Sequence, residues 1–179
     1  IAASLVEQID SLTKIANEFS HFSKMPKANE EELDLVPLLE HMSDLYSSNN
    51  VTIEFSNSIQ SNAFIFADKD LLVRVFNNLL KNAIQACEDK SNLLITIVLQ
   101  EQKEHLHIII KDNGKGIPEA IQNKIFVPNF TTKSTGTGLG LAMVKQIISN
   151  HNGEIWFETK EGEGTDFHIK LPKLSTNSK

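Results

Sequence analysis

The sequence contains little cysteine, no long apolar run and no excess of basic residues. Its single cysteine, Cys87, excludes a disulfide within the chain and fits a reducing compartment. No apolar run approaches the roughly 20 residues that span a bilayer, and the first residues, IAASLVEQID, lack the basic start and cleavage site of a signal peptide. The formal net charge of −6 disfavours nucleic acid as a partner, because proteins that bind its phosphates usually carry a basic face.

The chain is long enough for one domain and an appendage, with 179 residues of which 40% are hydrophobic. From Ile1 to Phe22 apolar residues recur every three or four positions, which predicts an amphipathic helix of about six turns. Pro26 and the acidic stretch NEEELD end this pattern, so we expect a linker or domain boundary between Lys24 and Asp34. An apolar stripe of this length needs a partner helix.

The remaining segments follow an order without a βαβ repeat. We expect a helix over 36–50, strands at 51–55 and 63–66, a helix over 69–86, strands at 91–100 and 105–112, a helix over 139–151, and strands at 153–159 and 164–172. In the last strand, inward positions begin at Thr165 and alternate to Leu171, as a half-buried strand requires. This order favours an α+β fold built as a two-layer sandwich.

Asparagine is unusually frequent in the helix predicted over 69–86. It costs several tenths of a kcal/mol against alanine inside a helix, yet Asn77, Asn78 and Asn82 all lie there. Residues four apart are roughly 6 Å apart on one face, so Asn78 and Asn82 can direct carboxamide oxygens to one point. Mg²⁺ accepts such a ligand and takes its anionic ligands from substrate phosphates. A solvated polar face explains the same pattern, and this helix alone does not separate the two interpretations.

The stretch DNGKGIP, from Asp112 to Pro118, follows an apolar strand. Asn-Gly between two strands would indicate a hairpin, but proline followed by glutamate is more typical of the first turn of a helix. Two glycines let the backbone approach a flat ligand closely, and a carboxylate at a strand end can accept a hydrogen bond from the exocyclic amine of adenine.

A second glycine-rich stretch, FTTKSTGTGLGLAMVKQII, precedes a helix. The free N–H groups at the start of that helix form an anion site, and Thr131, Thr132 and Lys133 add hydroxyl groups and a positive charge. The spacing G-x-G-x-G fits neither the P-loop nor the dinucleotide fingerprint. We therefore expect a loop that folds over phosphates, while a merely flexible connector is the alternative.

These motifs, in this order, resemble the ATP-binding domain of sensor histidine kinases, members of the GHKL superfamily. NNLLKNA is similar to their N box, DNGKGIP to the first glycine box, IFVPNFTTK to the F box and GTGLGLAMV to the second glycine box. The resemblance covers roughly residues 33–172. It implies the Bergerat fold, with a mixed sheet under helices on one face, and a mobile lid between the F box and Gly138.

The resemblance also implies roles for the matching residues. Asn82 would ligate Mg²⁺, and Asp112 would bind adenine. Asn78 and Lys133 are the catalytic candidates. The residues expected to bind ATP or ADP are Asn78, Lys81, Asn82, Asp112, Gly114, Gly116, Ile117, Thr132, Lys133, Gly136, Thr137, Gly138, Leu139, Gly140 and Leu141.

The segment NEFSHFSKMPK, residues 17–27, resembles the end of the second dimerisation helix of nitrogen-regulation-type sensor kinases. This implies a dimerisation segment over 1–27, a catalytic domain over 28–175, a homodimer, and a response regulator receiver domain as partner. In that family a preceding helix carries the phosphorylated histidine, followed by an acidic residue. None of the six histidines here is followed by one. We therefore expect γ-phosphoryl transfer from Mg-ATP to a histidine outside these residues, and no self-phosphorylation by this chain.

Three further expectations concern location, alternative functions and a histidine pair. We expect a cytoplasmic portion, and the sequence leaves open an inner-membrane anchor in the full-length protein. The alternatives are a GHKL ATPase or serine kinase, or a non-catalytic nucleotide-sensing module. GHKL ATPases and serine kinases carry a glutamate, which can act as a general base, where this chain has Asn78. The asparagine therefore favours the histidine kinase. His105 and His107 could face one metal ion, but we favour a solvated strand face.

Overall fold

The structure is a computed structural model of the chain. It describes residues 28–48, 51–59, 62–87, 93–133 and 136–174, together with the single positions 9, 13, 16 and 20. The long helix predicted over 1–22 therefore lies almost wholly outside the described residues, although the four described positions are helical. Within the described parts, no helix is long and apolar enough to cross a membrane.

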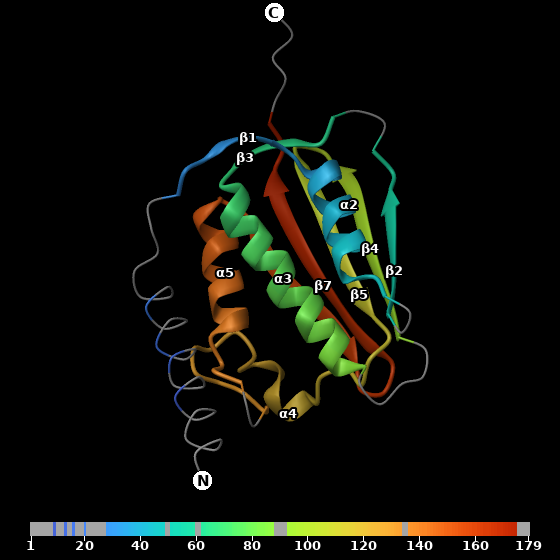
Figure 1. The fold of residues 1–179 in the computed structure, drawn as a ribbon, viewed down its shortest axis with the longest axis vertical. Helices are drawn as coiled ribbons and strands as arrows, with labels where there is room; N and C mark the ends of the chain where they lie inside the picture. Colours follow the sequence, from blue (N-terminus) through green and yellow to red (C-terminus); the bar gives the residue numbers. More distant parts are fainter. Residues whose placement is uncertain are drawn as a thin grey trace, which may run out of the picture.

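The described elements follow the predicted order, with one added strand at the start (Figure 1). They are β1 (Glu31–Asp34), α2 (Leu35–Tyr46), β2 (Val51–Asn57), β3 (Phe64–Ala67), α3 (Lys69–Ala86), β4 (Leu93–Gln102), β5 (His105–Asp112), α4 (Glu119–Gln122), α5 (Gly140–Asn150), β6 (Glu154–Lys160) and β7 (Gly164–Pro172).

The main sheet has five strands in the order β2-β4-β5-β7-β6. β2 pairs with β4 in parallel, whereas the other three pairs are antiparallel, so the sheet is mixed. Figure 1 shows α2, α3 and α5 side by side on one face of this sheet. The predicted α+β two-layer sandwich, with a mixed sheet and helices on one face, is confirmed.

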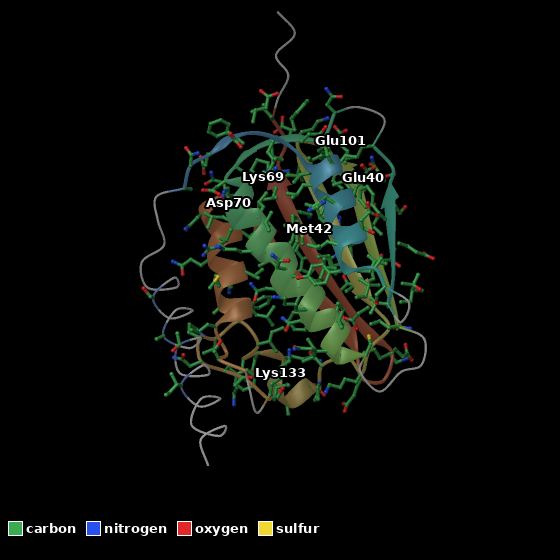
Figure 2. The ribbon with its side chains drawn as sticks, in the orientation of Figure 1. Glu40, Met42, Lys69, Asp70, Glu101 and Lys133 are labelled. Carbon is green, nitrogen blue, oxygen red and sulfur yellow. The ribbon has the colours of Figure 1, made fainter. Side chains whose placement is uncertain are left out.

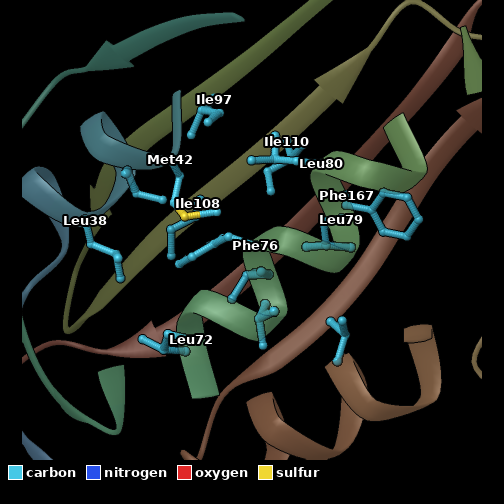
Figure 3. Packing of buried hydrophobic residues seen from close by; sticks show 14 of the residues in the cluster. Leu38, Met42, Leu72, Phe76, Leu79, Leu80, Ile97, Ile108, Ile110 and Phe167 are labelled. Atoms are coloured by element: carbon cyan, nitrogen blue, oxygen red, sulfur yellow. The ribbon is translucent and has the colours of Figure 1, made fainter. Parts of the chain in front are cut away.

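The core lies between these helices and alternate residues of the strands (Figure 3). In the sheet, Ile97 pairs with Ile110, which in turn pairs with Phe167, so the three side chains form one row on the inner face. α3 packs Phe76 and Leu79 against this face, and all five side chains are buried. The apolar residues of α3, which repeat with the 3.6-residue helical period, thus pack against strand residues that alternate with a period of 2.

The first strand of the structure, β1, was not predicted. Residues 31–34 pair in antiparallel register with β3 as a separate two-stranded sheet, where the sequence indicated a linker. The acidic residues hid this strand, because only one apolar side chain, Leu33, interrupts them. Asp34 then accepts a hydrogen bond from the Val36 N–H at 3.0 Å and caps α2, which ends at Tyr46 rather than at residue 50.

The interpretation of His107 as part of a solvated strand face is wrong. His107 is 5% exposed on the outer face of the sheet and stacks with Trp156 and His168. Its Nε2 lies 3.1 Å from His168 Nδ1, whereas His105 is exposed. The described residues contain no group of three histidine, cysteine, aspartate or glutamate side chains that could hold a metal ion.

Candidate active site

The predicted metal ligand, Asn82, faces the glycine-rich loop from a position one turn before the end of α3. Its Oδ1 accepts a hydrogen bond from Lys133 Nζ at 2.8 Å, across 51 residues of sequence. The same ammonium donates to Oε1 of Gln85, less than one turn further along α3. Figure 2 shows Lys133 at the end of the molecule where α4 also lies. Tertiary structure therefore brings together two residues that the sequence assigned to metal and phosphate binding.

Asn78, one turn earlier on α3, contacts the start of α5. Its Nδ2 donates to the Arg74 carbonyl oxygen at 2.8 Å, so the amide is oriented by its own helix. Its Oδ1 would lie 2.6 Å from a Cβ added at Gly140. Asn78 and Asn82 therefore share one side of α3, but different parts of the loop occupy the space in front of them.

The start of α5 has the properties of an anion site. No side chain caps its first N–H groups, and its first turn contains no acidic residue. These N–H groups and the positive end of the helix dipole favour negative charge. Because Gly140 is the first residue of α5, this end lies directly beside Asn78.

Asp112 ends β5 and is held by backbone groups. Its Oδ1 accepts hydrogen bonds from the N–H of Gly114 at 2.8 Å and of Thr165 at 3.2 Å. The side chain is only 8% exposed, so the carboxylate is fixed before any ligand arrives. This geometry suits a carboxylate that must accept a hydrogen bond in one direction.

The loop after Asp112 packs against the end of α3. The Lys115 N–H donates to the Ala86 carbonyl oxygen at 3.0 Å, and Gly114 has Ala86 directly beside it. Gly116 has φ +69°, which disfavours other residues. The chain continues into α4 rather than into a returning strand, so the hairpin alternative is wrong.

Two residues near Asp112, Thr159 and Thr165, were missed by the sequence analysis as site residues. The Thr159 hydroxyl donates to the Gly164 carbonyl oxygen at 2.9 Å and accepts from the Ile117 N–H at 3.0 Å. Its single hydrogen is thus used, so the Thr165 hydroxyl, 3.0 Å away, donates to it. The sequence did contain a signal for Thr165 as a site residue, because it is the one polar residue among the inward-facing positions of β7, whose other members are apolar.

The two ends of the glycine-rich loop lie against each other. The Thr131 hydroxyl accepts from the Lys133 N–H at 3.0 Å, and the Gly136 N–H donates to the Lys133 carbonyl oxygen at 3.2 Å. Gly138 has φ +70°, and a Cβ there would meet the Asn129 backbone at 2.6 Å. The predicted mobile lid falls partly on residues 134–135, outside the described residues.

The other predicted residues contribute less to this arrangement. Leu139 is 2% exposed, and its N–H donates to Thr137 Oγ1 at 3.4 Å. Ile117 and Leu141 pack at the edge of the core. Lys81 and Thr132 are exposed, and neither side chain forms a hydrogen bond with another described residue.

Along α3, the three contacts are ordered from Asn78 at α5, through Asn82 at Lys133, to Ala86 at the loop after β5. At a rise of 1.5 Å per residue, these positions span about 12 Å. A ligand with an adenine end at Asp112 and an anionic end at α5 would lie along this helix. The fold is a mixed sheet under three helices, and the loops that carry the predicted motifs all contact one of these helices, α3. This combination defines an ATP-binding domain of the Bergerat type.

Comparison with known proteins agrees with this class. The family of histidine kinase-, DNA gyrase B- and HSP90-like ATPases matches residues 67–175. Sporulation kinase E of Bacillus subtilis (strain 168) is 34% identical over 172 residues, which cover 94% of this chain and 23% of that protein. The catalytic domain of histidine kinase ThkA is 32% identical with a TM-score of 0.72, covering 81% of this chain and 96% of that one.

A second structure, of ThkA in complex with response regulator protein TrrA, is 26% identical with a TM-score of 0.76 and covers 97% of this chain and 50% of that one. The chain spans about a quarter of the length of the sporulation kinase. The chain belongs to the histidine kinase-, DNA gyrase B- and HSP90-like ATPase family, and within it is a histidine kinase catalytic domain that binds ATP.

Proposed function

We propose that this chain is the catalytic portion of a nitrogen-regulation-type sensor kinase. Residues 1–27 belong to the second helix of its dimerisation domain, and residues 28–175 bind Mg-ATP. The portion is cytoplasmic, and the whole protein is a homodimer that passes its phosphoryl group to a response regulator. The observation that carries the proposal is the order of contacts along α3, with Asp112 at one end and Lys133 and the α5 N-terminus at the other.

Asp112 accepts the hydrogen bond from the exocyclic amine of adenine. Its Oδ1 is held by two backbone N–H groups, so the carboxylate does not reorient when the base arrives. Guanine presents a carbonyl oxygen at that position, and two acceptors facing each other repel. The site therefore selects adenine over guanine.

The residues at the other end fit a phosphate chain and a divalent cation. The hydrogen bond from the Lys133 ammonium to Asn82 Oδ1 supports a cation site here, because this neutral oxygen accepts from a positively charged group. Mg²⁺, when bound, would neutralise charge on the phosphate oxygens. Lys133, Lys81, the hydroxyls of Thr131 and Thr132 and the α5 N–H groups hold the phosphates in place.

Asn78 favours transfer to a protein acceptor over hydrolysis of ATP. A carboxamide cannot remove a proton from water, so α3 supplies no general base at this position. A histidine imidazole needs no such base to expose its lone pair. Its free nitrogen attacks the γ-phosphorus, the bond to the bridging oxygen breaks and ADP leaves, while the other ring nitrogen gives up its proton to the acidic residue that follows the histidine in that family.

The adenine assignment is tested by calorimetric titration of ADP into wild type and Asp112→Asn. The amide turns one acceptor into a donor that faces the amine, so affinity should fall by about tenfold to hundredfold, or about 1 to 3 kcal/mol. Asp166→Asn is the matched control, because Asp166 pairs with Lys111 on the outer face of the sheet. Equal ADP affinity of Asp112→Asn and wild type would refute the assignment. Asn82→Ala should remove the gain in affinity that Mg²⁺ gives wild type.

A further inference from the structure

Gln85 has no role in the site described so far, yet its side chain accepts a hydrogen bond from Lys133, which belongs to that site. Lys133 Nζ donates to Gln85 Oε1 and, at 2.8 Å, to Asn82 Oδ1. The two acceptors lie three residues apart on α3, on one side of the helix. Gln85 is exposed and uncharged, so nothing in the core requires it to be glutamine.

The contact between Lys133 and Asn82 excludes a metal ion from the same oxygen. Mg²⁺ requires ligands at about 2.0 to 2.1 Å with near-ideal octahedral geometry. An ammonium at hydrogen-bond distance from that oxygen would place a second positive charge within a few ångströms, and like charges at this separation repel. Asn82 Oδ1 can therefore hold Lys133 or the metal, but not both.

We propose that Lys133 is the resident cation of the nucleotide-free site and that Gln85 is the positioning residue that keeps it there. The proposal rests on the proposed function, because it assigns the exchange of Lys133 for Mg²⁺ to nucleotide binding. The phosphates drive this exchange, since a charged acceptor binds an ammonium more strongly than two neutral amides do. Lys133 leaves Asn82 and Gln85, contacts the phosphates, and exposes the metal ligand in the same movement.

Replacing Gln85 tests the proposal without altering any residue assigned to nucleotide binding. Gln85→Met keeps the length of the side chain and removes the acceptor. Mg-ADP should then bind about threefold to tenfold more tightly, the value of one charge-assisted hydrogen bond reduced by solvent screening. Adenosine has no phosphates and should bind both proteins equally. Gln146→Met, the same change at an exposed position of α5, should behave as wild type.

A second measurement reports directly on the contact between Lys133 and Gln85. Acetylation of Lys133 by a water-soluble ester, followed by mass spectrometry, should be faster in Gln85→Met than in wild type when nucleotide is absent. Unchanged labelling and unchanged Mg-ADP affinity in Gln85→Met would overturn the inference while leaving the proposed function intact. Weaker Mg-ADP binding by Gln85→Met would also overturn it, because Gln85 would then present Lys133 to the phosphates. Failure of wild type to bind any adenine nucleotide would overturn both.

Discussion

At the scale of single residues, Asp112 is fixed from two directions by backbone N–H groups. One belongs to the loop that follows it and the other to Thr165, 53 residues later. The second contact requires β7 to begin very close to the end of β5. Gly164 makes this possible, because any Cβ there would overlap the carbonyl oxygen of Asp112.

We predict that Gly164→Ala lowers both stability and ADP affinity. Its φ of +130° and the overlap with Asp112 both penalise a side chain, so the free energy of unfolding should fall by about 1 to 3 kcal/mol. Gly162→Ala is the matched control: φ is +83°, but nothing lies within 4 Å of an added Cβ. In urea denaturation, Gly162→Ala should lose less free energy of unfolding than Gly164→Ala. In ADP calorimetry, Gly162→Ala should keep the wild-type affinity. Equal losses at both positions would contradict the steric argument.

At the scale of elements, α3 is the helix to which the others are attached. Tyr46 at the end of α2 donates its hydroxyl to Asn77 Oδ1 at 2.7 Å. At the start of α3, the Asp68 N–H donates to Nε2 of the buried His151, directly after α5. Asp68 also caps α3 and accepts from the Asn29 N–H at 2.8 Å. These polar contacts link the end of α2 and the residue after α5 to α3 and its N-cap.

We predict that the contact between Tyr46 and Asn77 offsets the poor helix propensity of asparagine. Tyr46→Phe should lower the free energy of unfolding by about 1 kcal/mol, because it leaves a half-buried oxygen without its donor. Asn77→Ala alone loses the same bond but gains about 0.5 kcal/mol of helix propensity. The double-mutant cycle, measured by urea denaturation, should give a coupling of about 1 kcal/mol. A coupling near zero would mean that the contact contributes nothing to stability.

At the scale of the whole molecule, the two faces of the sheet differ. The inner face is apolar and lies under the helices, whereas the outer face carries Trp156, His168 and His107 stacked across three strands. Gln100 and Gln102 donate to His107 Nδ1 at 2.9 Å, so His107 Nε2 carries its proton and donates to His168. His168 Nε2 is buried and forms no hydrogen bond with the described residues, although Glu158 Oε1 lies 3.9 Å from it. Both rings are thus neutral in the folded protein.

We predict that this histidine pair makes the protein less stable in mild acid. Burial lowers the pKa of His107 and of His168, and the charge of Lys170 lowers both further, while Glu158 and Asp166 partly oppose this for His168. Below about pH 6.5 the unfolded chain therefore binds more protons than the folded one. The free energy of unfolding should fall as pH decreases from about 6.5, by at most about 1.4 kcal/mol per pH unit for each histidine.

Urea denaturation between pH 7.5 and 5.5 tests this slope. The double variant His107→Gln/His168→Phe should have a shallower dependence on pH than wild type. His105→Asn, at an exposed position of the same strand, should be parallel to wild type. If the double variant kept the wild-type slope, the pH dependence would come from other groups.

A second prediction at this scale concerns phosphoryl transfer. Given radiolabelled Mg-ATP, this chain alone should not acquire label on histidine, because none of its histidines is followed by an acidic residue. Mixed with a longer product of the same gene that includes upstream residues and carries Asn82→Ala, it should label that partner with acid-labile phosphate. Acid-stable label on this chain itself would indicate a serine kinase and contradict the proposed function.

The sequence by itself determined the features that depend on local periodicity and on local motifs. The apolar spacing of α3 gave its bounds of 69 and 86, and the alternation of β7 gave its inward residues. The glycine motifs predicted segments where the backbone would approach a ligand. These features are readable because each depends on residues within a few positions of one another.

Only the tertiary structure decided which of these segments meet. Lys133 reaches Asn82 across 51 residues, and His107 meets His168 across 61, and no local pattern encodes either pairing. The same holds for β1, whose acidic residues become a strand because β3 offers them an edge. Sheet register and helix packing set these distances. The sequence therefore predicted candidate residues for the site, while their contacts, including the one between Lys133 and Gln85, follow from how the layers pack.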